Sequence, residues 1–125
     1  MPTNCPFCQV LDDQIRHQNA AGSSFRDAYP ISDGHTLVVP RKHVASLFDL
    51  PAEEYAALWG LVAEVRSRLQ TEFQPAGFNI GVNDGLAAGQ TVAHAHIHVI
   101  PRYNGDVADP RGGIRWIIPE KARYW

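Results

Sequence analysis

The chain has 125 residues, 45% of them apolar, and a formal net charge of −2. That length is typical of one domain with its own hydrophobic core, so we expect a single domain over residues 1–125. No apolar run is long enough to span a bilayer, and the near-neutral charge argues against nucleic acid as a partner. The first residues lack the basic and apolar regions of a signal peptide, which predicts a cytoplasmic location.

Both cysteines lie near the start of the chain, as Cys5 and Cys8. In a cytoplasmic protein this spacing indicates a metal-binding turn or a redox pair rather than a structural disulfide. A redox pair usually follows a strand and opens a helix, whereas residues 5–16 are predicted to form a turn and then a short helix or loop. We therefore favour half of a zinc site, with two unconnected thiols as the alternative.

Two strands are predicted in the first half of the chain. One covers residues 23–29, where alternation places Phe25 and Asp27 on the same face. The second covers residues 35–39, which are rich in β-branched side chains, and it ends at Pro40.

One long helix is predicted to follow. Pro51 stands near its first position, and Glu53 and Glu54 place negative charge in the first turn, where the helix dipole favours it. Apolar residues then recur at spacings of three and four until the helix ends at about Phe73; they are Tyr55, Leu58, Leu61, Val62, Val65 and Leu69. We interpret this stripe as core packing without a chemical role.

The second half of the chain is predicted to return to strands. One strand is expected over residues 78–83 and another over 94–101, joined by a glycine-containing loop at 84–91. Strands, one long helix and further strands indicate an α+β fold with a mainly antiparallel sheet and its helices on one face. The tail from about 110 to 125 is polar, contains a glycine pair and is then aromatic. A mobile flap and a surface extension both fit it.

Histidine alternates with apolar residues from His94 to His98. In an extended strand, His94, His96 and His98 would line one face roughly 7 Å apart, given a rise of about 3.3 Å per residue. The other face would be apolar and suited to a core. Such a row of imidazoles is typical of a metal site or of a nucleophilic or proton-transfer site; a polar face exposed to water is the alternative.

Two polar motifs precede this row, namely Asn83-Asp84-Gly85 and Gly89-Gln90-Thr91. Together with His94-x-His96-x-His98 they resemble the histidine-triad (HIT) family of nucleotide hydrolases and transferases, and residues 35–43 resemble another block of that family. The resemblance implies a HIT-like fold, with an antiparallel sheet of about five strands, one long helix and one short helix. It also implies a homodimer that acts on a nucleotide.

The resemblance further implies a role for each residue of the triad. His96 would attack the α-phosphate of a nucleotide to give a nucleotidyl-histidine. His98 and the backbone near His94 would orient and stabilise it. The implied contacts to phosphate and ribose come from Asp27, Asn83, Gln90 and Thr91.

The residue types also suit this chemistry on physical grounds. Neutral imidazole is a good nucleophile near pH 7, and loop donors stabilise the charge that develops on phosphate oxygens. Gly89 allows the backbone to approach a phosphate closely. Phe7 and Phe25 are candidate walls of an adenine pocket. His35 is interpreted either as a hydrogen-bonded partner of the triad or as a buried core residue.

Two substrate classes remain open within the family. The stretch from Gly89 to Val92 is nearer to the fragile-histidine-triad branch, whose members cleave dinucleoside polyphosphates. Asp27 instead matches the purine nucleoside phosphoramidase branch. Since histidine pairs on strands also bind zinc, a metal-dependent or nucleotide-binding protein is the alternative outside this activity.

A structural zinc ion is the expected cofactor, and no organic cofactor is expected. Bacterial members of the family have similar four-ligand sites, and His43 lies just after the strand predicted at 35–39. The predicted ligands are Cys5, Cys8, His43 and His94. His94 would then bind the metal, leaving His96 and His98 for the chemistry.

Overall fold

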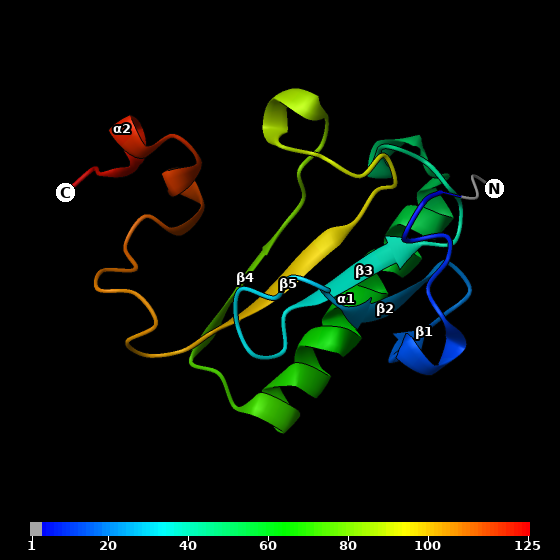
Figure 1. The fold of residues 1–125 in the computed structure, drawn as a ribbon, viewed down its shortest axis with the longest axis horizontal. Helices are drawn as coiled ribbons and strands as arrows, with labels where there is room; N and C mark the ends of the chain where they lie inside the picture. The colour runs from blue at the N-terminus through cyan, green and yellow to red at the C-terminus, as the bar shows by residue number, and fades with distance from the viewer. Residues whose placement is uncertain (1–3) are drawn as a thin grey trace.

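A five-stranded antiparallel sheet forms the centre of the computed structural model, which describes residues 4–125 (Figure 1). The strands lie in the order β1-β2-β3-β5-β4. Their bounds are His17–Gln18 for β1, Gly22–Arg26 for β2, Thr36–Pro40 for β3, Gly77–Gly81 for β4 and Ile97–Arg102 for β5. A long helix and a short one, α1 over Ala52–Phe73 and α2 over Pro119–Ala122, complete the α+β fold that the sequence predicts.

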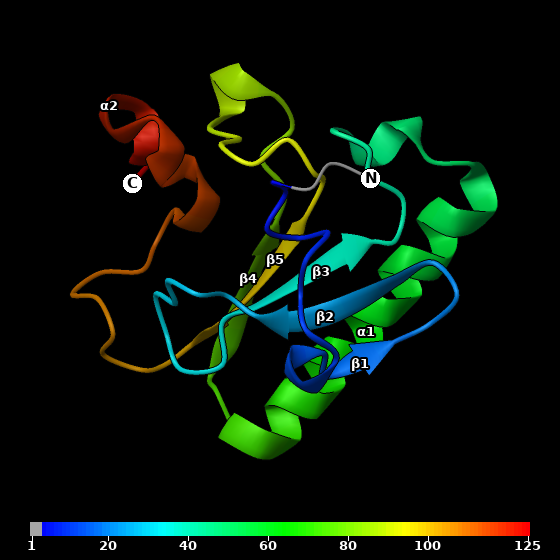
Figure 2. The same ribbon diagram turned by 45° about the vertical axis from the view of Figure 1, so that its right-hand side comes forward.

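Helix α1 lies along one face of the sheet (Figures 1 and 2). It begins directly after Pro51 and ends at Phe73, as predicted. The buried stripe of α1 packs against the sheet, and burying each large aliphatic side chain of this stripe contributes about 1.5–3 kcal/mol. The shared core comprises Val38, Leu47, Leu50, Leu58, Leu61, Val62, Val65, Leu69, Ala95, Ile97 and Val99.

The opposite face of the sheet carries a smaller apolar cluster and part of the histidine row. Phe25, Leu37 and Val39 are buried there, with Phe7 of the N-terminal segment packed against them. Residues paired across strands point to the same side of a sheet, and Leu37 pairs with both Phe25 and His98. The imidazole of His98 therefore lies on the face that α1 does not cover.

The last strand begins later than the sequence predicts. The chain bends at residues 92–94, and β5 starts at Ile97, so His94 and His96 precede the strand. The bend forms because the amide of Ala95 donates to the carbonyl of Val44 at 2.7 Å, outside the sheet ladder. Alternation still places Ala95 and Ile97 in the core under α1, but the three imidazoles do not form one row on one strand.

Other strand limits also differ from expectation. The strands predicted over 23–29 and 78–83 end at Arg26 and Gly81. The first stops because the carboxylate of Asp27 accepts a hydrogen bond from the amide of Tyr29 at 2.8 Å and turns the chain. The two-residue strand β1 is too short to produce a recognisable sequence pattern.

The C-terminal segment extends away from the sheet beside β4 in both views (Figures 1 and 2). Within this segment, Gly112 and Gly113 have φ of 93° and 48°, a backbone conformation that favours glycine. A short 3₁₀ helix, Gly113–Ile117, then packs against α2. None of the helices formed by residues 4–125 has the length and apolarity needed to cross a bilayer.

Candidate active site and metal centre

Four potential metal ligands converge beside the sheet. Cys5 and Cys8 come from the N-terminal turn, His43 follows β3, and His94 lies in the bend before β5; their ligand atoms all lie within 4.8 Å of one another. Sγ of Cys8 is 3.2 Å from Nδ1 of His43, and Sγ of Cys5 is 3.5 Å from Nδ1 of His94. The structure thus brings together all four residues that the sequence suggests as ligands.

The protonation chemistry of this cluster suits a divalent cation. Burial, together with the neighbouring Cys5 thiol, raises the pKa of Cys8, so thiolates here require a positive charge nearby. Nε2 of His94 donates to the carbonyl of Pro40 at 2.9 Å, which leaves the lone pair of Nδ1 facing the sulfurs. Burial also lowers the pKa of His94 and keeps this ring neutral. Two sulfur and two nitrogen donors are a set that zinc prefers.

His96 is held in one tautomer by the backbone. Its side chain is buried, with 8% of its surface exposed. Nδ1 of His96 lies 2.8 Å from the carbonyl oxygen of His94 and donates to it. A neutral imidazole has a single N–H, so Nε2 of His96 keeps an unprotonated lone pair. That is the arrangement required of a nucleophilic imidazole.

His98 is oriented by a chain of polar side chains on the same face of the sheet. The amide of Ile31 donates to Nδ1 of His35 at 3.2 Å, so a neutral His35 carries its proton on Nε2. Nε2 of His35 lies 2.9 Å from Nδ1 of His98 and donates to it. A carboxylate oxygen of Asp27 lies 3.4 Å from the same Nε2. His98 therefore presents a protonated Nε2, a donor, next to the His96 ring.

Burial keeps the rings of His98 and His35 neutral. Burial, then His96 and His35, lower the pKa of His98 to about 4. Burial also lowers the pKa of His35, although Asp27 opposes the shift. The rings of His96 and His98 lie with their centroids 5.2 Å apart. The neutral hydrogen-bond donor of His98 therefore lies beside the imidazole of His96.

The loop before the triad is fixed by the side chain of Gln90. Its Oε1 accepts from the amide of Gly85 at 2.9 Å, and its Nε2 donates to the carbonyls of Ala45 and Val92 at 2.8 and 3.0 Å. In this structure Gln90 is buried and holds the loop in shape. Its predicted substrate contact remains a prediction.

The remaining loop residues face outward. Asn83 and Thr91 are exposed, so their polar groups are accessible to a ligand. Gly85 and Gly89 have φ of 99° and 95°, a conformation in which a side chain is strained. The loop therefore exposes polar side chains, and its backbone conformation requires glycine at positions 85 and 89.

The aromatic residues proposed for an adenine pocket lie in different surroundings. Phe7 is half-buried, and its ring centroid lies 4.9 Å from that of His96. Phe25 is 5.6 Å from Phe7 but is buried among core residues, with 7% of its surface exposed. Of the two, Phe7 is the one whose ring packs edge-on against His94 and His96.

Some contributions to the site give no signal in the sequence. The carbonyls of Pro40 and His94 set two imidazole tautomers, and backbone groups have no motif of their own. Arg102, at the end of β5, is bonded to Asp106 at 2.7 Å and to Asn79 at 2.6 Å.

The site thus combines the bent segment that carries His94 and His96 with His98 at the start of β5, on the face of the five-stranded sheet that α1 does not cover. The family model for the HIT domain matches residues 9–105, and the chain belongs to the HIT family. That family includes nucleotide hydrolases, as one relative shows by name.

This relative is the asymmetrical bis(5'-nucleosyl)-tetraphosphatase of Schizosaccharomyces pombe. It is 36% identical over 110 residues, which cover 87% of this chain and 60% of that protein. A crystal structure of a HIT family protein from Bacillus anthracis has a TM-score of 0.76 and 32% identity, covering 97% of this chain and 91% of that one. A zinc-bound histidine triad protein from Mycobacterium smegmatis has a TM-score of 0.69 and 35% identity, covering 76% and 69%.

Proposed function

We propose that the protein is a nucleotide hydrolase that cleaves dinucleoside polyphosphates at the α-phosphate through a nucleotidyl-histidine at His96. The observation that carries the proposal is the hydrogen bond from Nδ1 of His96 to the carbonyl of His94. It leaves Nε2 of a neutral ring available to attack phosphorus. The named tetraphosphatase among the relatives supports the substrate class.

The reaction has two steps that use the same ring nitrogen. First, Nε2 of His96 forms a bond to the α-phosphorus while the bond to the bridging oxygen breaks, and the remaining polyphosphate leaves. Water then attacks the same phosphorus, the P–N bond breaks, and a nucleoside monophosphate is released as the ring is restored. Nε2–H of His98 is suited to donate to a phosphate oxygen as negative charge develops.

A nucleoside phosphoramidate is the second candidate substrate. It is favoured by Asp27, which is an aspartate as in that branch and lies 3.4 Å from His35. The first step would be the same attack, with an amine instead of a polyphosphate as the leaving group. Rates on a diadenosine polyphosphate and an adenosine phosphoramidate, measured side by side, decide between the two classes.

We further propose that Cys5, Cys8, His43 and His94 hold a structural zinc ion. The converging donors support this site, as does the zinc-bound relative. Bound there, the ion would stabilise both thiolates and tie the N-terminal turn to the bend before β5. Purified metal-replete protein is expected to contain about one zinc per chain, and Cys5→Ser is expected to lower that content. Zinc-free protein under these conditions would rule the site out.

A homodimer is the proposed assembly. Strand β4 is an edge of the sheet, and Ile80 on it is exposed; unpaired edges of this kind are usually covered or paired. Light scattering at micromolar concentration is expected to report about twice the mass of the 13.8 kDa chain. A mass near that of one chain would contradict the dimer.

The decisive experiment traps the covalent intermediate. A labelled diadenosine polyphosphate is mixed with the enzyme and quenched within one turnover under mildly alkaline denaturing conditions, because phosphoramidates are labile in acid. Label is expected on the wild-type protein, to be lost on later acid treatment, and to be absent from His96→Ala. His98→Asn is the matched control, because it changes a neighbouring imidazole and keeps the nucleophile. Equal labelling of His96→Ala would refute the assignment.

A further inference from the structure

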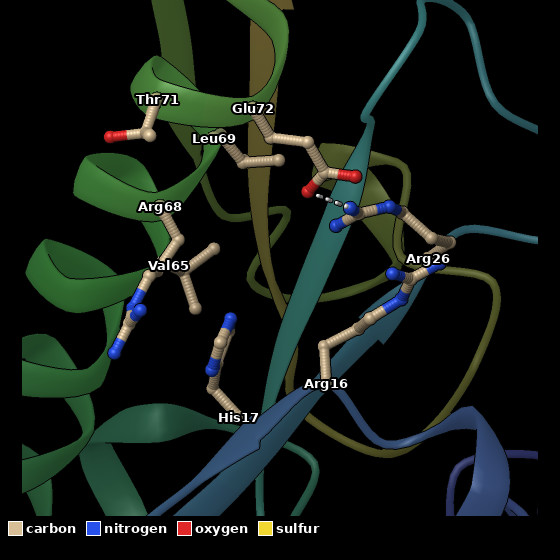
Figure 3. A pocket seen from close by; sticks show the side chains of 8 residues that line it. All are labelled: Arg16, His17, Arg26, Val65, Arg68, Leu69, Thr71 and Glu72. Carbon is tan, nitrogen blue, oxygen red and sulfur yellow. Dashed lines mark hydrogen bonds and ion pairs between the residues drawn. The ribbon is translucent and has the colours of Figure 1, made fainter.

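A cavity whose lining includes three arginines lies on the α1 side of the sheet. It has a volume of about 390 Å³ and lies between β1, β2 and the C-terminal half of α1 (Figure 3). Arg26 pairs in register with Thr36, and Thr36 with Val99, whose side chain is in the core under α1. Arg26 therefore points to the face opposite His98. The lining residues are Arg16, His17, Arg26, Val65, Arg68, Leu69, Thr71 and Glu72.

Positive charge exceeds negative charge in this cavity. Arg26 donates to Glu72 at 3.0 Å and to Thr36 at 2.8 Å, so the one carboxylate of the lining is already paired. The side chain of Arg16 has no hydrogen-bond or ion-pair partner within residues 4–125, and it lies beside Arg26 (Figure 3). Arg68 stands at the rim, 4.0 Å from the exposed Glu64.

This arrangement is unfavourable for the protein alone. Burial lowers the pKa of Arg26, and the positive charge of Arg16 lowers it further. The half-buried guanidinium group of Arg26 and the exposed one of Arg16 repel each other unless an anion lies between them. Asp12 and Glu64 line a neighbouring hollow that also includes Arg16 and His17, but in the part of the chain that the structure describes neither carboxylate forms an ion pair with Arg16 or Arg26.

The lining also indicates the kind of anion. Guanidinium groups bind phosphate oxygens with paired N–H donors. The floor at Val65 and Leu69 is apolar, and the ring of His17 points into the space between strand and helix (Figure 3). A cavity of about 390 Å³ accommodates a phosphate with a small organic group attached.

We infer that this cavity is a binding site for a phosphate monoester, separate from the histidine site. The phosphate would contact Arg16 and Arg26, and the organic group would lie over Val65 and Leu69. The inference does not depend on the proposed reaction, since the site lies across the sheet from His96.

Titration followed by amide NMR tests the site, with inorganic phosphate in one arm and phenyl phosphate in the other. Changes in amide chemical shift are expected at His17, Leu69 and Thr71. The expected dissociation constant is below about 1 mM for phenyl phosphate, with weaker binding of inorganic phosphate. Equal binding of the two probes would mean that the phosphate alone is recognised and would overturn the monoester assignment. Potassium chloride at matched ionic strength controls for screening.

Variants locate the binding. Arg16→Gln is expected to weaken the binding of phenyl phosphate about tenfold, because it removes a charge-assisted contact. The side chain of Arg16 is exposed and, among the residues described, holds no other part of the fold in place. Arg68→Gln is expected to have a smaller effect, and Arg66→Gln, the same charge change on another face of α1, is expected to have none. Shifts confined to the surroundings of His96, or unchanged affinity in Arg16→Gln, would overturn the inference.

Discussion

On the α1 face of the sheet, buried residues such as Val38, Leu61 and Ile97 meet one another through apolar contacts. On the other face, His35 and His96 are buried and His98 is half-buried, and each of these rings has at least one nitrogen in a specified hydrogen bond. Apolar contacts are non-directional and tolerate changes of shape, whereas each buried hydrogen bond fixes a proton to one atom.

The difference separates two kinds of consequence. Substitution on the α1 face removes buried area and lowers the free energy of unfolding. Substitution on the histidine face alters which nitrogen is free or protonated, and it changes the chemistry of the site more than the stability of the fold. Substitutions on each face, with stability and kcat measured on the same variant, test that separation.

The largest effect is expected from His96→Ala. Removing an essential nucleophile typically lowers kcat by about 10³-fold or more. Nucleotide binding should persist because Asp27 and the loop remain, and the melting temperature should change little. Steady-state kinetics and calorimetry on the same preparation measure both quantities. A folded variant that keeps most of the wild-type kcat would show that His96 does not carry the reaction.

Leu61→Ala is expected to produce the converse result. Leu61 is 1% exposed, and truncating such a side chain lowers the free energy of unfolding by about 3 kcal/mol. The kcat of the folded variant should remain close to that of the wild type. Urea unfolding gives the stability, and Ala63→Ser on the exposed side of α1 is the matched control. A large loss of kcat with unchanged stability would break the proposed separation of the two faces.

A smaller effect is expected from pH. Burial lowers the pKa of His98 in the folded protein to about 4, so between pH 4 and about 6.5, the ordinary value, the unfolded chain binds more protons. Stability is therefore greatest above pH 6.5 and is lost as pH falls toward 4. After discounting for partial solvent screening, this contribution is about 2 kcal/mol. Urea unfolding across this range should show a shallower dependence in His98→Asn; identical slopes would contradict it.

Patterns that repeat along the chain were sufficient to predict the framework. The period of α1 identified its core stripe and both of its ends, because apolar spacing and a proline start act locally. Alternation also identified the buried face of Ala95 and Ile97. The antiparallel sheet followed from the order of these elements.

The details of the site depended on tertiary contacts that no local pattern encodes. The predicted start of β5 was wrong because the amide of Ala95 donates to the carbonyl of Val44, about fifty positions away in the chain. The sequence named His35 as a possible partner of the triad, but the proton direction from His35 to His98 depends on the amide of Ile31. The cavity beside Arg16 and Arg26 has no motif at all, since its charges come from separate elements.

The smallest effect is expected from removing the C-terminal segment after Asp109. Its short helices pack mainly on each other, and Arg111 lies over Trp125 with its guanidinium carbon 4.6 Å from the ring centroid. Deletion should therefore change the free energy of unfolding by less than about 1 kcal/mol.

If the segment acts as a flap, Arg111 and Arg115 would exchange their internal contacts for phosphate contacts when a long substrate binds. Deletion should then raise KM about threefold for a dinucleoside polyphosphate and leave KM for an adenosine phosphoramidate unchanged, a difference of less than about 1 kcal/mol. Trp125→Ala, which loosens the stacking without removing either arginine, is the matched control and should shift KM less than the deletion. Equal changes for both substrates would instead assign the segment a packing role, because a flap that contacts distal phosphates must distinguish a substrate that has them from one that lacks them.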